Sequence, residues 1–400
     1  MNQQDKIQEV LFRGVENIYP NKQALEKELK SNRKLKLYCG YDPTAPTLHI
    51  GHAITLRKLA QFQALGHKVI MLIGDFTAMI GDPTDKTEVR KKMTRKQVLD
   101  NAKNYKKLAG KILRFSGENS AKIMYNSQWN DKLTFLDLIE IASNFTVQQI
   151  LARDMFQERL KQGKPIYRHE FLYPLAQAYD SVEMDIDLEV GGNDQTFNML
   201  CGRDLMKALK NKEKFVLTTK LLVDPSGKKM GKTEGNMVAL DAEPNQMYGL
   251  IMSWPDELIL LGLELCTDVS MTEIIQTGKQ IKDGKANPRN IKARLAREIV
   301  SIHHSKKSAL GAEKEFNRVF QKREKPSEMP VFKLSGRKYN ILDLLVKTKL
   351  TFSKAEARRL VEQGAVKIDG KVIKDWRAEI DIKDRMIIQA GKRKFVQIKK

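Results

Sequence analysis

His49-Ile50-Gly51-His52 stands between a strand-like run, Leu35 to Gly40, and a helical pattern that extends from Ala53 to Leu65. A helix start carries unpaired backbone N–H groups and the positive end of the helix dipole, so a phosphate group can dock there. Two imidazoles three residues apart would add hydrogen-bond donors on the same face. The stretch therefore predicts a phosphate-binding turn that opens a helix.

The surrounding pattern indicates a βαβ unit. The helical segment ends at Gly66, and Val69 to Ile73 is a short apolar run that suits a buried parallel strand. The fold class we expect is therefore α/β with a parallel sheet. Ligands of open α/β sheets lie at the carboxyl ends of the strands. The residues expected to rim that crevice are Tyr38, Cys39, Gly40, Asp75 and Thr77.

A second basic stretch, Lys229-Met230-Gly231-Lys232-Thr233, lies far downstream and could close on the same phosphates. Each stretch also has a simpler interpretation: two surface histidines or half a metal site for the first, and a solvated loop for the second. No HExxH occurs, and Cys39, Cys201 and Cys266 are too scattered for a zinc cluster, so we predict no metal ligands. A Walker loop is excluded because only three residues separate Gly227 from Gly231, where four are needed.

The amino-acid composition limits the classes of protein to which this chain can belong. The 400 residues are 41% hydrophobic, enough for two or three domains, and 71 basic against 49 acidic side chains leave a net charge of +22. That charge favours a polyanionic partner such as nucleic acid. Three scattered cysteines favour a reducing compartment. The first twenty residues lack the apolar core of a signal peptide, and no run reaches membrane-spanning length. We expect a soluble, cytoplasmic protein with no membrane contact.

The pattern changes along the chain. Residues 1–240 alternate strand-like and helix-like segments, and an apolar helical run at about 130–165 suits either core packing or a dimer face. Helical periodicity continues over 241–320. Residues 321–337 begin with the charged, proline-containing stretch QKREKPSEMP and are interpreted as a linker. Residues 338–400 form a compact basic module.

That basic module holds nearly half of the net charge. From Gly336 onward, 18 Lys and Arg stand against 8 Asp and Glu, leaving +10. Ser353 to Gly364 has a serine N-cap, a glutamate at the capping-box position and a glycine stop, and an Asp-Gly hairpin turn follows. Lys354, Arg358 and Arg359 crowd like charges together, which an RNA backbone would relieve. A solvated charged helix is the alternative.

A third group of residues forms a polar stripe on a helix face that would normally be apolar. Tyr173, Gln177 and Asp180 fall at i, i+4 and i+7, which places them on one helix face in an otherwise apolar segment. Such a stripe predicts a ligand, with a hydrogen-bonded core network as the alternative.

These motifs resemble those of the class I aminoacyl-tRNA synthetases, whose HIGH signature is matched letter for letter and whose KMSKS signature appears as KMGKT. The YxxxQxxD helix, Asp42-Pro43-Thr44-Ala45 and the GGNDQ stretch at Gly191–Gln195 narrow the resemblance to tyrosyl-tRNA synthetases. The segment from Ser353 to Gly370 resembles the S4 RNA-binding domain. The resemblance implies a Rossmann-like catalytic domain with a helical dimerisation insertion, an α-helical anticodon-binding domain and an S4-like domain.

The resemblance also implies the reaction. L-tyrosine and Mg²⁺-bound ATP would give tyrosyl-adenylate and pyrophosphate, and the tyrosyl group would pass to tRNA(Tyr), in a homodimer. Such chemistry needs positioning and charge stabilisation rather than a protein nucleophile. The residues implied in catalysis are Thr44, His49, His52, Lys229, Lys232 and Thr233. Those implied in tyrosine binding are Tyr38, Asp82, Tyr173, Gln177, Asp180 and Gln195. Those implied in ATP binding are Cys39, Gly40, Asp42, His49, Gly51, His52, Gly192, Asp194, Lys229, Met230 and Lys232. Lys354, Arg358 and Arg359 are implied in tRNA binding.

The sequence departs from the family pattern at two positions, and two other functions would explain part of it. Gly231 replaces the serine of KMSKS, and Asp85 replaces a glycine that often follows the IGDP stretch, which leaves the effect on loop function open. Lys86 and Arg90 are either extra phosphate contacts or simply exposed. A tryptophanyl-tRNA synthetase shares the signatures, but an indole N–H gives no reason for paired contacts from Tyr38 and Asp180. An RNA-binding protein derived from a synthetase would leave the two signatures unexplained.

Overall fold

The structure is a computed structural model that describes residues 2–84, 92–224, 227, 237–320, 329–391 and 394–400. The chain divides into two compact units, Met1–Glu313 and Lys314–Lys400. The boundary falls within helix α17 (Lys306–Phe320). We describe each unit by itself.

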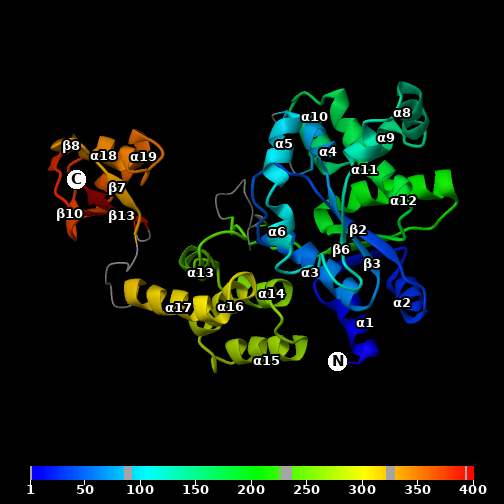
Figure 1. Ribbon diagram of the computed structural model, residues 1–400, viewed down its shortest axis with the longest axis horizontal. Helices are drawn as coiled ribbons and strands as arrows, with labels where there is room; N and C mark the ends of the chain where they lie inside the picture. Colours follow the sequence, from blue (N-terminus) through cyan, green and yellow to red (C-terminus); the bar gives the residue numbers. More distant parts are fainter. Residues whose placement is uncertain (1, 85–91, 225–226, 228–236, 321–328, 392–393) are drawn as a thin grey trace. The chain divides into compact units, whose positions relative to one another are not determined.

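The first unit is built on a six-stranded sheet in the order β1-β6-β5-β2-β3-β4 (Figure 1). Its strands are β1 (Val15–Tyr19), β2 (Lys36–Tyr41), β3 (Lys68–Ile73), β4 (Lys122–Tyr125), β5 (Leu188–Gly192) and β6 (Phe215–Thr219). All neighbours are parallel except β1, which pairs antiparallel with β6. This confirms the predicted α/β fold with a parallel sheet, and β2 and β3 match the two predicted strands within one residue.

Helices cover both faces of the sheet. Helix α3 (Ile50–Ala64) connects β2 to β3, and α12 (Thr196–Lys210) connects β5 to β6, in the opposite direction along the sheet. Right-handed crossovers in opposite directions place these helices on opposite faces. Helix α11 (Leu172–Glu183) packs beside α12. The chain thus reverses direction between β2 and β5, where a ligand crevice is expected.

The other helices of this unit flank the sheet or follow it. They are α1 (Gln3–Phe12), α2 (Lys22–Lys30), α4 (Thr77–Ile80), α5 (Arg95–Ala102), α6 (Tyr105–Ala109), α7 (Ser127–Asn130), α8 (Phe135–Ala142), α9 (Val147–Leu151), α10 (Asp154–Lys161), and the short 3₁₀ segments η1 (Arg168–Phe171) and η2 (Asn193–Gln195). Residues 241–320 carry the helices α13 (Pro244–Met252), α14 (Leu258–Cys266), α15 (Met271–Lys282), α16 (Pro288–His303) and α17. The predicted helical character of that region is confirmed.

The apolar run at 130–165 folds as the three separate helices α8, α9 and α10. Ile141 and Ile150 are buried, as core packing requires. Phe135, Leu136 and Val147 are instead 79%, 64% and 58% exposed. Core packing therefore accounts for only part of the pattern.

The second unit has a core of its own. A five-stranded sheet in the order β10-β9-β12-β13-β7 stands beside a two-stranded sheet of β11 and β8. Its strands are β7 (Val331–Lys333), β8 (Lys338–Asn340), β9 (Val366–Ile368), β10 (Lys371–Ile373), β11 (Glu379–Asp381), β12 (Ile387–Ala390) and β13 (Lys394–Lys399), and its helices are α18 (Ile341–Lys347) and α19 (Lys354–Glu362). Residues from both helices and from both sheets pack into one hydrophobic cluster.

The second unit begins earlier than the sequence suggested. Strand β7 pairs parallel with β13, and Leu334 is buried in the core, although both fall in the predicted linker 321–337. The linker prediction is wrong for that part, because an edge strand of three residues has too short a pattern to recognise. Residues 321–328 lie outside the described part of the chain.

Local sequence signals in this unit are confirmed with one change. Ser353 Oγ accepts a hydrogen bond from Glu356 N at 3.1 Å, but Glu356 Oε2 accepts from Phe352 N at 2.8 Å rather than from the Ser353 amide of a standard capping box. Asp369 and Gly370 have φ values of 46° and 86°, as the predicted two-residue hairpin turn requires.

The three cysteines are buried and free. Within the described residues, no group of three or more His, Cys, Asp or Glu side chains could hold a metal ion. None of the described helices is long and apolar enough to cross a membrane.

We expect the first unit to lose stability in mild acid through His67. Its Nδ1 accepts a hydrogen bond from Leu35 N at 3.2 Å, and burial lowers the pKa of His67 to about 4. Between pH 6.5 and 4 the unfolded chain binds a proton that the folded protein refuses, so the unfolding free energy falls as pH falls, by up to about 1.4 kcal/mol per pH unit. Urea unfolding at pH 7 and pH 5 measures this change. It should be smaller in His67→Asn, and equal slopes would contradict the assignment.

Candidate active site

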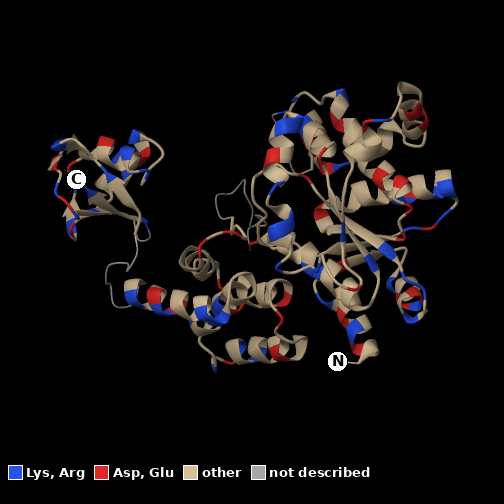
Figure 2. Ribbon diagram, viewed as in Figure 1, with Lys and Arg blue, Asp and Glu red and all other residues tan. Residues whose placement is uncertain are grey.

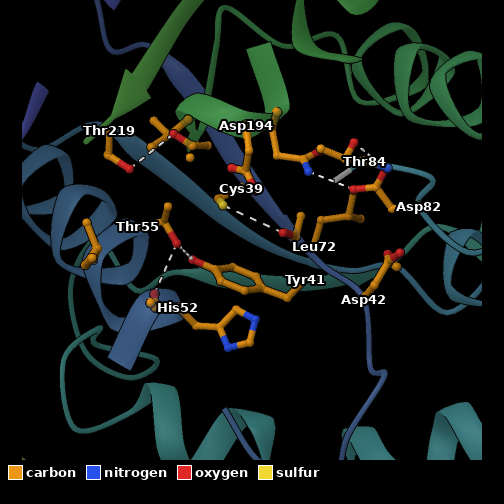
Figure 3. A pocket seen from close by; sticks show the side chains of 18 of the residues that line it. Cys39, Tyr41, Asp42, His52, Thr55, Leu72, Asp82, Thr84, Asp194 and Thr219 are labelled. Atoms are coloured by element: carbon orange, nitrogen blue, oxygen red, sulfur yellow. Dashed lines mark hydrogen bonds between the residues drawn. The ribbon is translucent and has the colours of Figure 1, made fainter. Parts of the chain in front are cut away.

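A cavity of about 980 Å³ lies where β2 and β5 end, at the reversal point of the sheet (Figure 3). Residues from the end of β2, the start of α3, one face of α11 and the turn after β5 line it. The predicted site residues that line it are Tyr38, Cys39, Gly40, Asp42, Thr44, His49, Gly51, His52, Asp82, Tyr173, Gln177, Asp180, Gly192, Asp194 and Gln195. The fold thus brings together, from five separate segments, every described residue predicted for tyrosine or ATP. Lys229, Met230, Gly231, Lys232 and Thr233 lie outside the described residues, as do Asp85, Lys86 and Arg90.

The start of α3 differs from the prediction in one chemical respect. The helix begins at Ile50, with His49 as its N-cap, and its first amides are already paired. Ile50 N donates to Val238 O at 2.9 Å, Gly51 N to His49 Nδ1 at 3.1 Å, and His52 N to His49 O at 2.9 Å. The expectation that free backbone N–H groups would hold a phosphate here is therefore wrong.

The two imidazoles of this turn are held in a defined orientation. His52 Nδ1 accepts from His49 N at 3.1 Å, and the two rings stack with their centroids 3.8 Å apart. A neutral imidazole that accepts through Nδ1 carries its proton on Nε2, so both rings are held as Nε2–H donors. Burial lowers the pKa of His52 well below its ordinary value, which keeps it neutral. In Figure 3 the His52 ring lies beside Tyr41, with the ring centroids 5.9 Å apart.

Asp180 is the buried acceptor at the inner end of the cavity. Its side chain is 2% exposed, and its carboxylate accepts from Trp129 Nε1 at 2.7 Å, Asn130 Nδ2 at 3.0 Å and Asn126 Nδ2 at 3.2 Å. Burial raises the pKa of Asp180 to about 8, although these three donors oppose the shift. The sequence analysis missed the three donors. The only signal was a cluster of polar residues directly after the end of β4.

Tyr38 does not contact Asp180 by hydrogen bond. Its hydroxyl lies 3.1 Å from Ser181 Oγ, although both Tyr38 and Asp180 line the cavity. Burial raises the pKa of Tyr38 well above its ordinary value, so the hydroxyl stays protonated.

Three of the other residues predicted to bind tyrosine, Tyr173, Gln195 and Asp82, make hydrogen bonds within the protein. Tyr173 Oη donates to Asp42 Oδ2 at 3.0 Å, and Gln195 Nε2 donates to Asp82 Oδ2 at 2.7 Å. Asp82 also accepts from Thr84 N and Thr84 Oγ1 (Figure 3). These bonds form two links at the cavity, one from α11 to the segment after β2 and one from η2 to the segment after α4.

Asp75 was wrongly placed at the rim of the crevice. It is buried but does not line the cavity, because its carboxylate turns away to accept from Ser127 N, Ser127 Oγ and Arg95. It holds α7 against the end of β3 and so positions Asn126, Trp129 and Asn130 behind Asp180.

In the second unit, the predicted RNA-binding residues differ in their partners. Lys354 pairs with Asp343 at 2.5 Å, and Arg358 pairs with Glu362 at 2.8 Å while its guanidinium lies 4.5 Å from the Trp376 ring centroid. Arg359 is exposed. Figure 2 shows Lys and Arg positions, in blue, alternating with Asp and Glu positions, in red, along the ribbon of this unit.

A parallel sheet with this histidine turn at its reversal point is the arrangement of a class I synthetase. Consistently, residues 30–321 match the family described as tRNA synthetases class I (W and Y), and residues 321–398 match the tyrosine–tRNA ligase SYY-like C-terminal domain.

The particular branch follows from individual relatives. The tyrosine–tRNA ligase of Moorella thermoacetica is 42% identical over 97% of this chain and 94% of its own length, and that of Thermotoga maritima is 44% identical over 97% and 96%. A C-terminally truncated mitochondrial tyrosyl-tRNA synthetase of Coccidioides posadasii superposes with a TM-score of 0.63 at 27% identity, covering 77% of this chain and 91% of that one. This chain belongs to the tyrosine–tRNA ligase family of class I aminoacyl-tRNA synthetases.

Proposed function

We propose that the protein activates L-tyrosine with ATP and transfers it to tRNA(Tyr). The tyrosine carboxylate attacks the α-phosphate of ATP, which gives tyrosyl-adenylate and pyrophosphate, and the terminal ribose of the tRNA then takes the tyrosyl group. The observation that carries this proposal is the shared cavity: a buried acceptor, Asp180, lies at one part of it and two imidazole Nε2–H donors at another.

From the polar groups of the cavity we assign a binding position to each end of the two substrates. Tyr38 and Asp180 line the part of the cavity suited to a phenol, while Asp82, Tyr173, Gln177 and Gln195 supply oxygens and amides for the amino acid head group. His49 and His52 lie at the start of α3 and Thr44 in the loop before it, where donors can stabilise charge on the phosphates. Cys39, Gly40, Asp42, Gly51, Gly192 and Asp194 line the remainder and are proposed to hold the nucleotide. Lys229, Met230, Lys232 and Thr233 are proposed to act from the segment outside the described residues.

Magnesium is proposed to enter as the complex with ATP. Tryptophan is the weaker substrate candidate, because an indole offers one N–H donor and no oxygen to receive a hydrogen bond from Tyr38.

Assembly and location are further proposals. The exposed apolar side chains of α8 and α9, Phe135, Leu136, Ile139 and Val147, suit a homodimer contact. We propose a cytoplasmic enzyme, with 1–240 as the catalytic domain, 241–320 as an anticodon-binding domain and the unit from β7 onward as an S4-like tRNA-binding domain.

The test is amino-acid-dependent exchange of pyrophosphate into ATP, measured with each of the twenty amino acids. Exchange should depend on tyrosine, and only weak exchange should occur with phenylalanine or tryptophan. Exchange that prefers another amino acid, or no exchange at all, would overturn the proposed activity.

We expect His49→Ala to slow adenylate formation by about 10² to 10³ while tyrosine affinity stays within a few-fold. The reason is that a phosphate donor strengthens its contact as charge develops in the transition state. Lys232→Ala should behave likewise. Single-turnover stopped-flow measures the rate, and tyrosine titration measures the affinity. His169→Ala, at a histidine that does not line the cavity, is the control. An unchanged rate would remove either residue from the proposed role.

A further inference from the structure

A buried ion pair lies at the wall of the cavity, which Glu189 lines. Glu189 on β5 and Lys214 just before β6 are in ion-pair contact, with side chains 2% and 0% exposed. A buried pair of this kind contributes little net stability, because the lost hydration of both charges offsets their attraction. Its main effect is on the direction of the hydrogen bonds that neighbouring side chains make.

The sheet register brings this pair against two residues of α11. Glu189 is the register partner of Tyr38 on the adjacent parallel strand, so the two side chains leave the same face of the sheet, beneath α11. Gln177 Nε2 donates to Glu189 Oε1 at 2.9 Å. Ser181, one helical turn later, accepts from Lys214 Nζ at 2.8 Å. The pair thus contacts one neighbour through its carboxylate and the other through its ammonium.

The carboxylate sets the direction of the Gln177 amide. A carboxylate only accepts hydrogen bonds, so Gln177 must turn its NH₂ group towards Glu189. The amide oxygen of Gln177, which lines the cavity, is then left as an acceptor for the ligand.

The ammonium fixes the partners of the neighbouring Ser181. An ammonium only donates, so Ser181 Oγ accepts from Lys214 Nζ. Ser181 Oγ in turn donates to Glu189 Oε2 at 3.4 Å and lies 3.1 Å from Tyr38 Oη. Lys214 therefore holds the carboxylate of Glu189 both directly and through Ser181.

A glycine makes room for the ammonium. Gly202 lies within α12, and a Cβ added there would lie 2.5 Å from Lys214 Nζ and 3.0 Å from Ser181 Oγ. Glycine is unfavourable inside a helix, so its presence at the point where α12 meets Lys214 is an independent sign that the ammonium needs this position.

We propose that Glu189, Lys214 and Gly202 are positioning residues in the amino acid pocket: Glu189, held by Lys214 in the space that Gly202 leaves, fixes the direction of the Gln177 amide so that its oxygen is presented to the substrate ammonium. This proposal rests on the proposed function. Lys214 and Gly202 do not line the cavity, and Glu189, which does, acts here through Gln177.

The direct test compares two helical glycines. Gly202→Ala meets the ammonium, whereas Gly249→Ala in α13 meets nothing within 4 Å. In pyrophosphate exchange, Gly202→Ala should raise the KM for tyrosine by about ten- to a hundredfold, the effect of removing a hydrogen bond to a charged group, with the KM for ATP and kcat within about threefold. Gly249→Ala should change none of these constants.

Substrate analogues isolate the contact made by Gln177. Tyramine keeps the ammonium and the phenol, while 3-(4-hydroxyphenyl)propionate lacks the ammonium. As competitive inhibitors of Gly202→Ala, tyramine should lose more affinity than the propionate, because only tyramine uses the Gln177 oxygen. Equal losses of affinity for the two inhibitors would overturn the positioning role.

A second variant tests the same role in case Gly202→Ala fails to fold. Glu189→Gln combined with Lys214→Met removes both charges together, and its neutral amide can donate or accept, so Gln177 is no longer held in one direction. The same selective rise in the KM for tyrosine is expected, with thermal unfolding confirming a folded protein. If the wild-type protein is active but neither variant changes the KM for tyrosine, the positioning role alone is overturned. The same holds if the KM for tyrosine, the KM for ATP and kcat all change in parallel. Absence of tyrosine-dependent exchange in the wild-type protein overturns the proposed function and this inference together.

Discussion

Asp180→Ala is expected to lower tyrosine-dependent pyrophosphate exchange by about 10³ or more. The substitution removes the carboxylate that lines the part of the cavity assigned to the phenol, and it leaves the donors of Trp129, Asn126 and Asn130 without their acceptor. Sites that hydrogen-bond a substrate hydroxyl reject the analogue without it by about 10⁴ to 10⁵, and the upper value comes from tyrosyl-tRNA synthetase itself. Steady-state exchange with tyrosine and phenylalanine should show both a slower reaction and a smaller preference for tyrosine.

Asp187→Ala is the matched control for this prediction. Asp187 is a buried carboxylate that accepts from Lys36 N at 2.8 Å and pairs with Arg33 and Lys212, but it does not line the cavity. Its replacement should lower stability while exchange is kept within about tenfold. Full activity of Asp180→Ala, or equal losses in the two variants, would show that Asp180 acts through folding rather than at the phenol.

Truncation after Pro330 is expected to abolish tyrosyl transfer to tRNA while leaving pyrophosphate exchange near normal. The cut precedes β7, so it removes the five-stranded sheet and its hydrophobic cluster as a whole. The first unit keeps the complete cavity. Pyrophosphate exchange, tyrosyl transfer and circular dichroism, measured on one preparation of the truncated protein, test this prediction. Transfer that survives the cut, or exchange that disappears while the fold is intact, would contradict this division of labour.

Single charge reversals refine the same prediction. Arg358 is held by Glu362 and Trp376, and Lys354 by Asp343, whereas Arg359 is an exposed neighbour on the same helix. We therefore expect Arg359→Glu to weaken tRNA binding more than Arg358→Glu. Removing one side chain that binds a phosphate should flatten the log–log salt slope by about one unit. An unchanged slope would exclude phosphate binding by that residue.

Local signals in the sequence predicted the elements that carry the site. The apolar run at Val69–Ile73 and the polar stripe of Tyr173, Gln177 and Asp180 depend on the 2.0 and 3.6 residue periods of strands and helices, so neighbours along the chain reveal them. The capped helix after Ser353 and the Asp369-Gly370 turn are equally local. Class, fold and the residues that line the cavity could therefore be named before any coordinates.

Interactions between distant segments could not be predicted in this way. The HIGH stretch suggested free amides, yet Val238, nearly two hundred residues away, pairs with Ile50 N, and the imidazoles turn inward to cap their own turn. Asp75 and β7 were misplaced for the same reason, because their partners Ser127 and β13 are remote in sequence.

The amino-acid sequence by itself determined the parallel α/β architecture, the family and the side chains that surround the cavity, because periodicity and motif spacing are written along the chain. Only the tertiary structure decided which hydrogen-bond direction each of those side chains presents. The Glu189–Lys214 pair, brought beneath α11 by the register of β5 against β2, accepts from the NH₂ group of Gln177, and on our proposal this leaves the Gln177 oxygen for the ligand. Hydrogen-bond polarity depends on partners that meet only when strands and helices pack, since a side-chain amide or hydroxyl can face either way until a charged neighbour fixes it.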